Sequence, residues 1–196
     1  MHDLEAITLT QPARGACELV LDAQHFDRVV RDGALKAKVS LELATADFKA
    51  MLVPSASGAR EAPSIVTHLV RLAERGVEVR VLHAGVPSGP ALRELRRGLP
   101  ANLNIRRCPR LHAKAVIVDS GRMYLGSANL TGAGLGAKGP TRRNFEWGVV
   151  TESPELIDGI LQRFNALWEG THCDDCGRRD VCPIPLEEPR LSQRER

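Results

Sequence analysis

Apolar side chains recur along the chain with two different spacings, and the spacing switches several times between residues 20 and 170. Alternation of apolar and polar positions is typical of strands, whereas recurrence every three or four residues is typical of helices. The first pattern, together with short apolar runs, predicts strands at 38–46, 77–82, 103–107, 114–118, 123–125 and 144–150. The second pattern predicts helices at 23–36, 64–75, 90–97 and 154–168. This order of elements favours an α/β fold, with a mixed β-sheet sandwiched by helices.

The remaining segments have no strong periodicity. Residues 1–20 are expected to be irregular or extended, and Pro-Ser-Ala-Ser-Gly at 54–58 is expected to be a loop. The length of 196 residues suits one main domain, and 43% apolar residues can fill a sizeable core.

The first residues, Met-His-Asp-Leu-Glu, have neither the basic nor the apolar segment of a secretory signal. No stretch approaches the roughly 18 apolar residues of a membrane span. We therefore expect a cytoplasmic protein without a membrane partner. In that compartment, cysteines serve as metal ligands or buried thiols more often than as disulfides.

Polar residues with a regular spacing follow two of the predicted strands. His112 and Lys114 are two positions apart, so in an extended chain their side chains leave the same face. His112, a potential nucleophile or base, therefore lies beside the positive charge of Lys114. Ser127 and Asn129 have the same spacing and can bind the non-bridging oxygens of one phosphate, while Gly126 would let that phosphate approach the backbone closely. The set fits cleavage of a phosphodiester.

The spacing of this set resembles the motif of the phospholipase D superfamily. That motif is His-x-Lys, four residues, Asp, six residues, then Gly-Ser/Gly-x-Asn, and the chain matches it at every defined position from 112 to 129. The resemblance implies a phosphodiesterase that needs no catalytic metal and forms a phosphohistidine intermediate. The catalytic residues that it implies are His112, Lys114, Ser127 and Asn129. Asp119 and Gly126 are then structural members of the motif.

The resemblance implies one further catalytic residue, Glu146, downstream of the motif. In single-motif nucleases of the superfamily, such a glutamate hydrogen-bonds the histidine ring, which fixes its tautomer and stabilises the imidazolium. The glycine-rich segment 130–143 separates Glu146 from the motif and is interpreted as an insertion near the substrate entrance.

The mechanism of the superfamily uses two histidines, one as the nucleophile and one as the acid that protonates the leaving oxygen. None of the other histidines is followed two positions later by lysine. A homodimer that forms the active site across its two-fold axis is therefore expected. Because a histidine pKa is near 6.5, one neutral and one protonated ring can coexist near neutral pH.

Positive charges flank the motif on both sides, although the net charge is only +3 and the pI about 8.7. These candidate substrate-binding residues are Arg106, Arg107, Arg110, Lys138, Arg142 and Arg143. They fit a polyanionic substrate, or they are ordinary solvated charges. We expect a nuclease, with DNA favoured over RNA, and a helicase or a defence complex as a candidate partner. The alternatives are a phospholipase D-type lipid phosphodiesterase, disfavoured for want of an apolar surface, and a non-cleaving nucleic-acid-binding subunit of a defence or repair complex.

Three cysteines follow the last predicted helix with the spacing C-x2-C-x5-C, at Cys173, Cys176 and Cys182. Three soft ligands within ten residues indicate a metal centre. With Cys108 upstream, the set resembles the iron-sulfur staple of certain exonucleases and the tail of some single-motif phospholipase D-like proteins. A [4Fe–4S] cluster and zinc both fit, and His172 could replace Cys108 as the fourth ligand. The expected organisation is a catalytic domain at 1–170 and a metal-binding tail at 171–196, with Cys17 simply buried.

Overall fold

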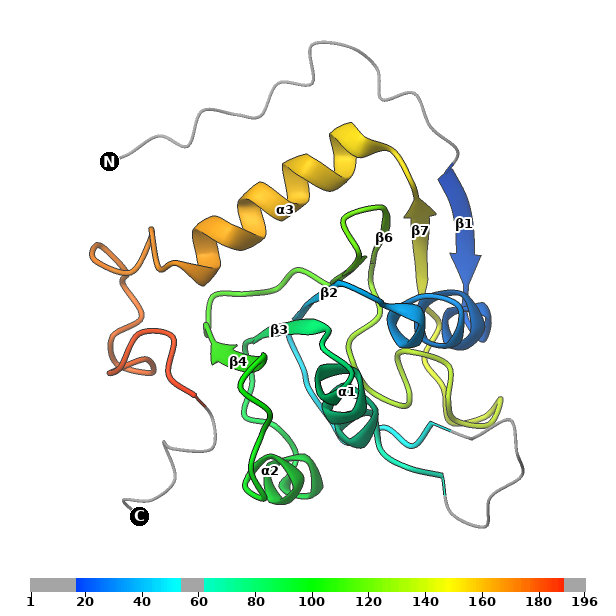
Figure 1. Ribbon diagram of the computed structural model, residues 1–196, viewed down its shortest axis with the longest axis horizontal. Helices are drawn as coiled ribbons and strands as arrows, with labels where there is room; N and C mark the ends of the chain where they lie inside the picture. The colour runs from blue at the N-terminus through cyan, green and yellow to red at the C-terminus, as the bar shows by residue number, and fades with distance from the viewer. Residues whose placement is uncertain (1–16, 54–61, 189–196) are drawn as a thin grey trace.

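A computed structural model describes residues 17–53 and 62–188 of the chain. Most of the expected lead-in and the expected loop at 54–58 lie outside these residues. The described chain contains a seven-stranded mixed sheet with the strand order β1-β7-β6-β5-β2-β3-β4 (Figure 1). The strands are β1 (Cys17–Leu21), β2 (Ser40–Thr45), β3 (Glu78–His83), β4 (Leu103–Arg107), β5 (Ala115–Val118), β6 (Arg122–Gly126) and β7 (Trp147–Thr151).

The two halves of the sheet follow different pairing rules. Strands β2, β3 and β4 are parallel and are joined through α1 (Ile65–Glu74) and α2 (Gly89–Leu95), because parallel neighbours need a crossover. Strands β5, β6, β7 and β1 continue the sheet in antiparallel pairs. The tight β5–β6 turn has positive φ at Asp119 (52°) and Ser120 (49°), and the Gly121 amide donates to the Val118 carbonyl (3.0 Å).

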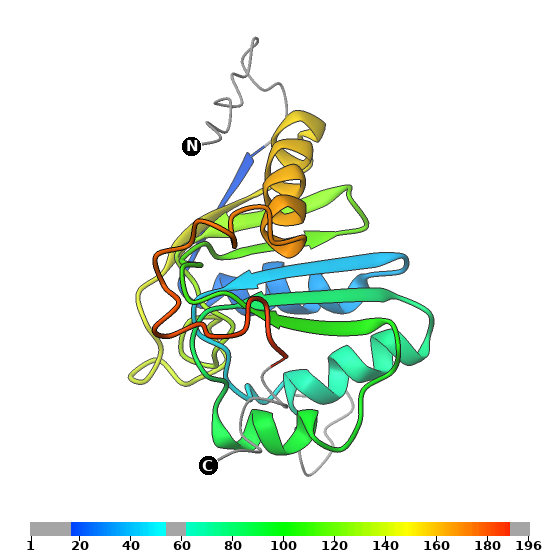
Figure 2. The same cartoon turned by 90° about the vertical axis from the view of Figure 1, so that its left-hand side faces the viewer.

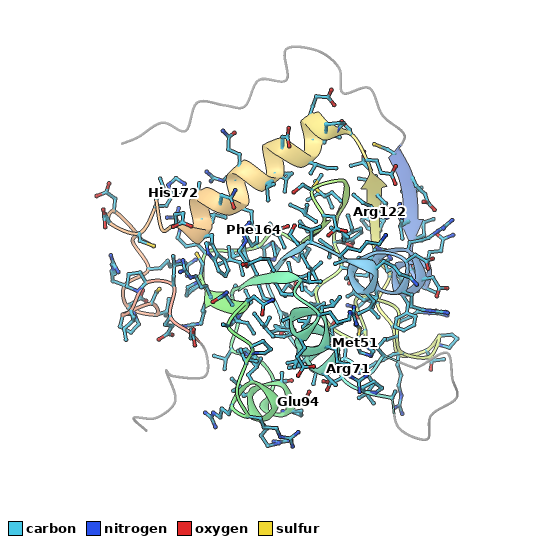
Figure 3. All side chains as sticks on the ribbon, viewed as in Figure 1. Met51, Arg71, Glu94, Arg122, Phe164 and His172 are labelled. Carbon is cyan, nitrogen blue, oxygen red and sulfur yellow. The ribbon has the colours of Figure 1, made fainter. Side chains whose placement is uncertain are left out.

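Helices cover both faces of the sheet, which confirms the predicted α/β sandwich (Figure 2). On one face, α1 and α2 pack against the parallel strands through side chains such as Leu69 and Val81. On the other face lies α3 (Pro154–Trp168), whose apolar stripe includes Ile157, Phe164 and Trp168. Figure 3 shows Phe164 on the side of α3 that faces the sheet.

The predicted single helix at 23–36 is wrong. The segment forms a π-helical turn at Phe26–Arg31 and a separate 3-10 turn at Ala34–Lys36. Gly33 lies between them, where a Cβ atom would stand only 2.4 Å from the carbonyl oxygen of Val29. Only glycine allows the backbone to turn this tightly, so the helical spacing of the apolar residues is kept while the regular helix is interrupted.

The chain after α3 forms a tail against β4. Between residues 169 and 188 the structure has no helix or strand. Arg107 holds the tail: its backbone N–H donates to the Glu187 carbonyl (3.1 Å), and its guanidinium contacts the Glu187 carboxylate (2.9 Å) and donates to the Val181 carbonyl (3.2 Å). Among the described residues, no helix has the length and apolar character to cross a membrane.

Candidate active site

The predicted catalytic residues meet at one edge of the sheet because four strands end there. In the register, Ala44 pairs with Ala115, Ala115 with Leu125, and Gly126 with Gly148. The end of β2, the start of β5, the end of β6 and the start of β7 are therefore neighbours. The four predicted catalytic residues of the motif lie just outside these ends, with His112 and Lys114 before β5 and Ser127 and Asn129 after β6. Lys114 was expected inside the strand.

His112 and Lys114 are in contact. The His112 ring is exposed, whereas Lys114 is buried, with 8% of its surface accessible. The Lys114 ammonium lies 3.3 Å from both ring nitrogens and donates to the His112 carbonyl oxygen at 2.7 Å. Burial lowers the pKa of Lys114, and the negative charge of Glu146 opposes this shift. A solvent-facing imidazole thus stands beside a largely desolvated cation, where an anionic ligand would restore the lost solvation.

Glu146 lies in the site, but its hydrogen bonds are not the expected ones. Its carboxylate accepts from the Ser127 hydroxyl and from the Asn144 side-chain amide (3.0 Å). Within this chain, the described contacts of the His112 ring are with Lys114 and none is with Glu146. The expectation that Glu146 fixes the His112 tautomer is therefore not met within one chain. Glu146 instead positions Ser127, whose hydroxyl also accepts from the Trp147 amide (3.1 Å).

Asn129 is locked in one orientation by the loop after β2. Its Oδ1 accepts from the backbone amides of Ala46 (3.1 Å) and Asp47 (3.0 Å). Because those donors require the oxygen, the Nδ2 group is turned away from them. The side chain can therefore donate to an anionic ligand without reorganising.

Asp119 lies at the opposite end of β5 and supports the fold. Its carboxylate accepts from the backbone amides of Val39 (2.8 Å), Ser40 (3.0 Å) and Lys38 (3.1 Å). Partial burial would raise the pKa of this carboxyl, but the three amides outweigh it and the pKa lies below its ordinary value. These bonds join the β5–β6 turn to the start of β2.

We expect Asp119→Asn to lower the free energy of unfolding by about 1–3 kcal/mol at neutral pH, because a charged acceptor of several amides is replaced by a neutral one. A carboxyl with a depressed pKa stabilises the fold above its ordinary value of 3.8 and loses that contribution as the pH falls through the folded pKa. The difference in unfolding free energy between variant and wild type should therefore shrink in acid. Urea unfolding at neutral pH and at a pH below 3.8 measures this difference, with the exposed Asp32→Asn as control. An equal loss at both pH values would contradict this role.

Gly126 has a packing role in the sheet. A Cβ at this position would lie 2.3 Å from the Tyr124 hydroxyl, and a Cβ at Gly148 would lie 2.4 Å from the Tyr124 ring. The two paired glycines therefore make room for the Tyr124 side chain across β6 and β7. This role fits Gly126 as a structural member of the motif, and the close approach of a phosphate to its backbone stays a prediction.

Sequence reasoning missed a buried network beneath the motif loop. The Tyr124 hydroxyl accepts from the Ala128 amide (3.1 Å) and contacts His25 Nε2 (3.0 Å), and His25 Nδ1 contacts the Asp22 carbonyl (2.9 Å). Burial lowers the pKa of His25, which favours the neutral ring. In that form Nδ1–H donates to the Asp22 carbonyl and Nε2 accepts from the Tyr124 hydroxyl. Burial raises the pKa of Tyr124 to about 12. The only sequence feature that pointed to this network was Tyr124, an aromatic residue with a hydroxyl group two positions before Gly126.

Comparison with known proteins identifies the family of this site. The family model described as "Cardiolipin synthase, PLD-like domain" matches residues 35–168. The chain belongs to this family. Among curated protein sequences, none matches the chain significantly.

Solved structures with this phospholipase D-like fold cover most of the chain. Nuc from Salmonella typhimurium, a phospholipase D family member, has 23% identity and a TM-score of 0.58, covering 80% of this chain and 95% of its own. NucT from Helicobacter pylori has 16% identity and a TM-score of 0.59, with 80% and 97% covered. Phosphatidylserine synthase from Haemophilus influenzae has 18% identity and a TM-score of 0.53, with 79% and 39% covered. At these identities the likeness shows the fold alone.

The flanking cations of this phospholipase D-like domain divide into two groups. Arg106 packs on α3, with its guanidinium 4.6 Å from the Trp168 ring centroid and donating to the Trp168 carbonyl. Arg107 holds the tail. Strand β4 therefore directs both side chains to structural partners, and the expectation that they bind substrate stays a prediction. Arg110 is exposed near Cys176, at 3.9 Å from its Sγ.

The three cations after the motif are free of side-chain partners within the described chain. Lys138 and Arg142 are exposed, and Arg143 is half-buried. They belong to the glycine-rich segment 130–143, which packs on the core through the buried Leu130 and Leu135. This group keeps its charge available for an anionic ligand.

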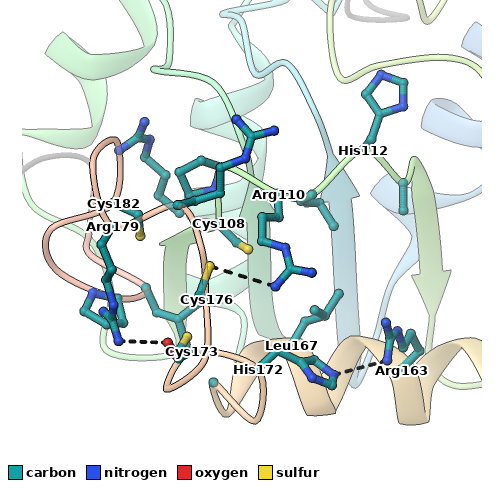
Figure 4. A pocket seen from close by; sticks show the side chains of 18 residues that line it. Cys108, Arg110, His112, Arg163, Leu167, His172, Cys173, Cys176, Arg179 and Cys182 are labelled. Atoms are coloured by element: carbon teal, nitrogen blue, oxygen red, sulfur yellow. Dashed lines mark hydrogen bonds between the residues drawn. The ribbon is translucent and has the colours of Figure 1, made fainter. Parts of the chain in front are cut away.

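Four cysteines line one pocket beside the active site (Figure 4). Cys108, Cys173, Cys176 and Cys182 surround a cavity of about 450 Å³, and His112 lies at its rim. His172 lines the same pocket, but its Nε2 lies 3.2 Å from the Arg163 guanidinium. Cys17, expected to be buried, is exposed on the edge strand β1.

Proposed function

We propose that the chain is a metal-independent phosphodiesterase that cleaves nucleic acid, with DNA favoured over RNA. The observation that carries the proposal is the exposed His112 ring beside the buried Lys114 ammonium, 3.3 Å from both ring nitrogens. The free cations Lys138, Arg142 and Arg143 near this family's motif support a polyanionic substrate.

In the proposed reaction, a neutral His112 nitrogen attacks phosphorus and forms a P–N bond as the bond to the leaving oxygen breaks. A protonated second imidazole gives its proton to that oxygen. The same imidazole, now neutral, then removes a proton from water, which attacks phosphorus and releases His112. Lys114 and the Asn129 amide offset the charge on the equatorial oxygens.

The second imidazole is proposed to come from a second copy of the chain. One chain supplies one such histidine, and an unpartnered apolar surface begins beside the site. We call this surface the apolar strip; its exposed members are Leu19, Leu21, Leu125, Phe145 and Trp147. Leu21 pairs with Trp147 across β1 and β7, so the strip is continuous over the end of the sheet. It begins next to Glu146, so a copy seated there would adjoin the site.

The apolar strip also favours a second candidate function. The sequence indicated no apolar surface for reaching lipid, and the strip contradicts that expectation. Phe145 and Trp147 are 88% and 65% exposed and flank Glu146. A membrane surface could contact them, so phospholipid cleavage is the second candidate.

The two candidates are separated by one set of assays in excess chelator. Purified protein is incubated with single- and double-stranded DNA, with RNA, and with phosphatidylglycerol vesicles. The proposal predicts cleavage of nucleic acid and none of lipid. Lipid cleavage alone would establish the second candidate, and nucleic-acid cleavage that requires added divalent metal would contradict the mechanism.

We expect the double variant Arg142→Ala/Arg143→Ala to raise KM for DNA severalfold with little change in kcat, because these side chains contact phosphates away from the reacting bond. The log–log slope of binding against salt should become shallower by about 0.9 for each duplex phosphate that the variant no longer neutralises. A steady-state titration at several salt concentrations measures both. Arg97→Ala, an exposed arginine just after α2, is the control at a distant surface cation. An unchanged slope would exclude Arg142 and Arg143 from the DNA interface.

A further inference from the structure

The pocket beside the active site is built from distant parts of the chain. Cys108 follows β4, with its amide bonded to the His83 carbonyl (2.8 Å), and the other three thiols come from the tail. Cys173 and Cys176 lie on one turn, in which the Cys176 amide donates to the Cys173 carbonyl (3.2 Å). Cys182 is buried. Folding therefore gathers four thiols that the sequence separates, in a tail with no regular elements among its described residues.

The chemistry around the thiols is that of a site for a negatively charged group. Five arginines line the same pocket: Arg107, Arg110, Arg163, Arg178 and Arg179. The Arg110 guanidinium lies 3.9 Å from Cys176 Sγ, and Arg179 donates to the Cys173 carbonyl at 2.8 Å (Figure 4). Thiolates bound to a metal centre keep excess negative charge, which these guanidinium groups would offset.

The alternative fourth ligand is engaged elsewhere. His172 Nε2 lies 3.2 Å from the Arg163 guanidinium, whereas Cys108 faces the three tail cysteines across the pocket (Figure 4). The geometry therefore favours a set of four cysteines over three cysteines and a histidine.

We propose that Cys108, Cys173, Cys176 and Cys182 together bind one [4Fe–4S] cluster. Among the described residues, no group of three or more His, Cys, Asp or Glu side chains is already arranged to hold a metal ion. Zinc needs all four sulfurs about 2.3 Å from one atom. A cubane cluster binds each thiolate at a separate iron, so its ligands are spread around a larger volume. The pocket that the four thiols line has a volume of about 450 Å³, which leaves room for a cubane.

The cluster would join the tail to the segment that leads into the catalytic motif. Cys108 precedes His112 by four residues, and both line the pocket. Binding would hold this segment against the tail, in addition to the Arg107–Glu187 ion pair. The cluster's role is structural, and the proposal does not depend on which substrate the active site takes.

The test is metal analysis of the full chain purified without oxygen. The proposal predicts about four iron and four acid-labile sulfide per chain, with broad visible absorption. Each of Cys108→Ser, Cys173→Ser, Cys176→Ser and Cys182→Ser should lose most of the iron. The controls Cys17→Ser and His172→Ala should retain it.

A second experiment uses wild-type protein alone, so its result does not depend on whether the cysteine variants fold. Wild-type protein stripped of metal should regain iron, sulfide and colour when ferrous iron, ferric iron and sulfide are added without oxygen. About one zinc per chain without iron would overturn the cluster. Iron retained by Cys108→Ser, or no metal in any preparation or after reconstitution, would also overturn the proposal.

Discussion

Replacing His112 with alanine is expected to reduce chelator-resistant cleavage of DNA by at least about 10³-fold, because the group that forms the covalent bond is removed. Binding should change little, since the proposed phosphate contacts of Lys114, Asn129 and the free cations remain. Gel assays of cleavage and fluorescence anisotropy of binding measure the two effects separately.

The matched control for this loss is His172→Ala, which removes an imidazole that contacts Arg163 outside the catalytic edge of the sheet. It should retain wild-type cleavage. A His112→Ala protein that cleaves within about tenfold of wild type would show that His112 is not the nucleophile. Loss of both binding and folding, seen by circular dichroism, would assign His112 a structural role instead.

A charge in the apolar strip is expected to convert the protein to a monomer and to remove most of its activity. Leu19 is 61% exposed on β1 and lies away from the motif, so Leu19→Asp leaves the catalytic residues of each chain intact. Burying an unpaired carboxylate in an apolar interface costs several kcal/mol, enough to weaken dimerisation by more than about 10²-fold. Sedimentation velocity gives the oligomeric state, and cleavage is assayed at the same concentrations.

Leu52→Asp is the matched control, because Leu52 is 60% exposed but lies outside the strip. It should stay dimeric and active. An active Leu19→Asp monomer would contradict the shared site. A dimeric Leu19→Asp protein would place the interface on another surface.

Local rules in the sequence were enough to predict six of the seven described strands and the helices on the two faces of the sheet, while β1 was expected to be irregular or extended. Alternation around Leu41 and Val79 identifies strands that are buried in the core, and the stripe containing Ile157 and Phe164 identifies α3. The interrupted helix around Gly33 was missed because its apolar spacing persists on both sides of the break. The spacing of apolar residues therefore predicts which side chains face the core, but it does not distinguish a regular helix from two short turns.

The motif residues could be predicted because their spacing is local, while their partners could not. Arg106 and Arg107 precede the motif, yet the strand directs them to Trp168 and Glu187, which come much later in the chain. The contact between Ser127 and Glu146 likewise depends on β6 pairing with β7. Long-range register decides such contacts, and the sequence pattern does not contain it.

The most direct test of a phosphodiesterase site shared by two chains is a titration of wild-type protein with inactive His112→Ala chains. The two folded proteins are mixed at a fixed total concentration until subunits have exchanged, and DNA cleavage is measured in excess chelator. If each site needs a histidine from both copies, activity falls as the square of the wild-type fraction. A linear fall would show that each chain carries a complete site, and no cleavage by pure wild-type protein would contradict the phosphodiesterase assignment on DNA.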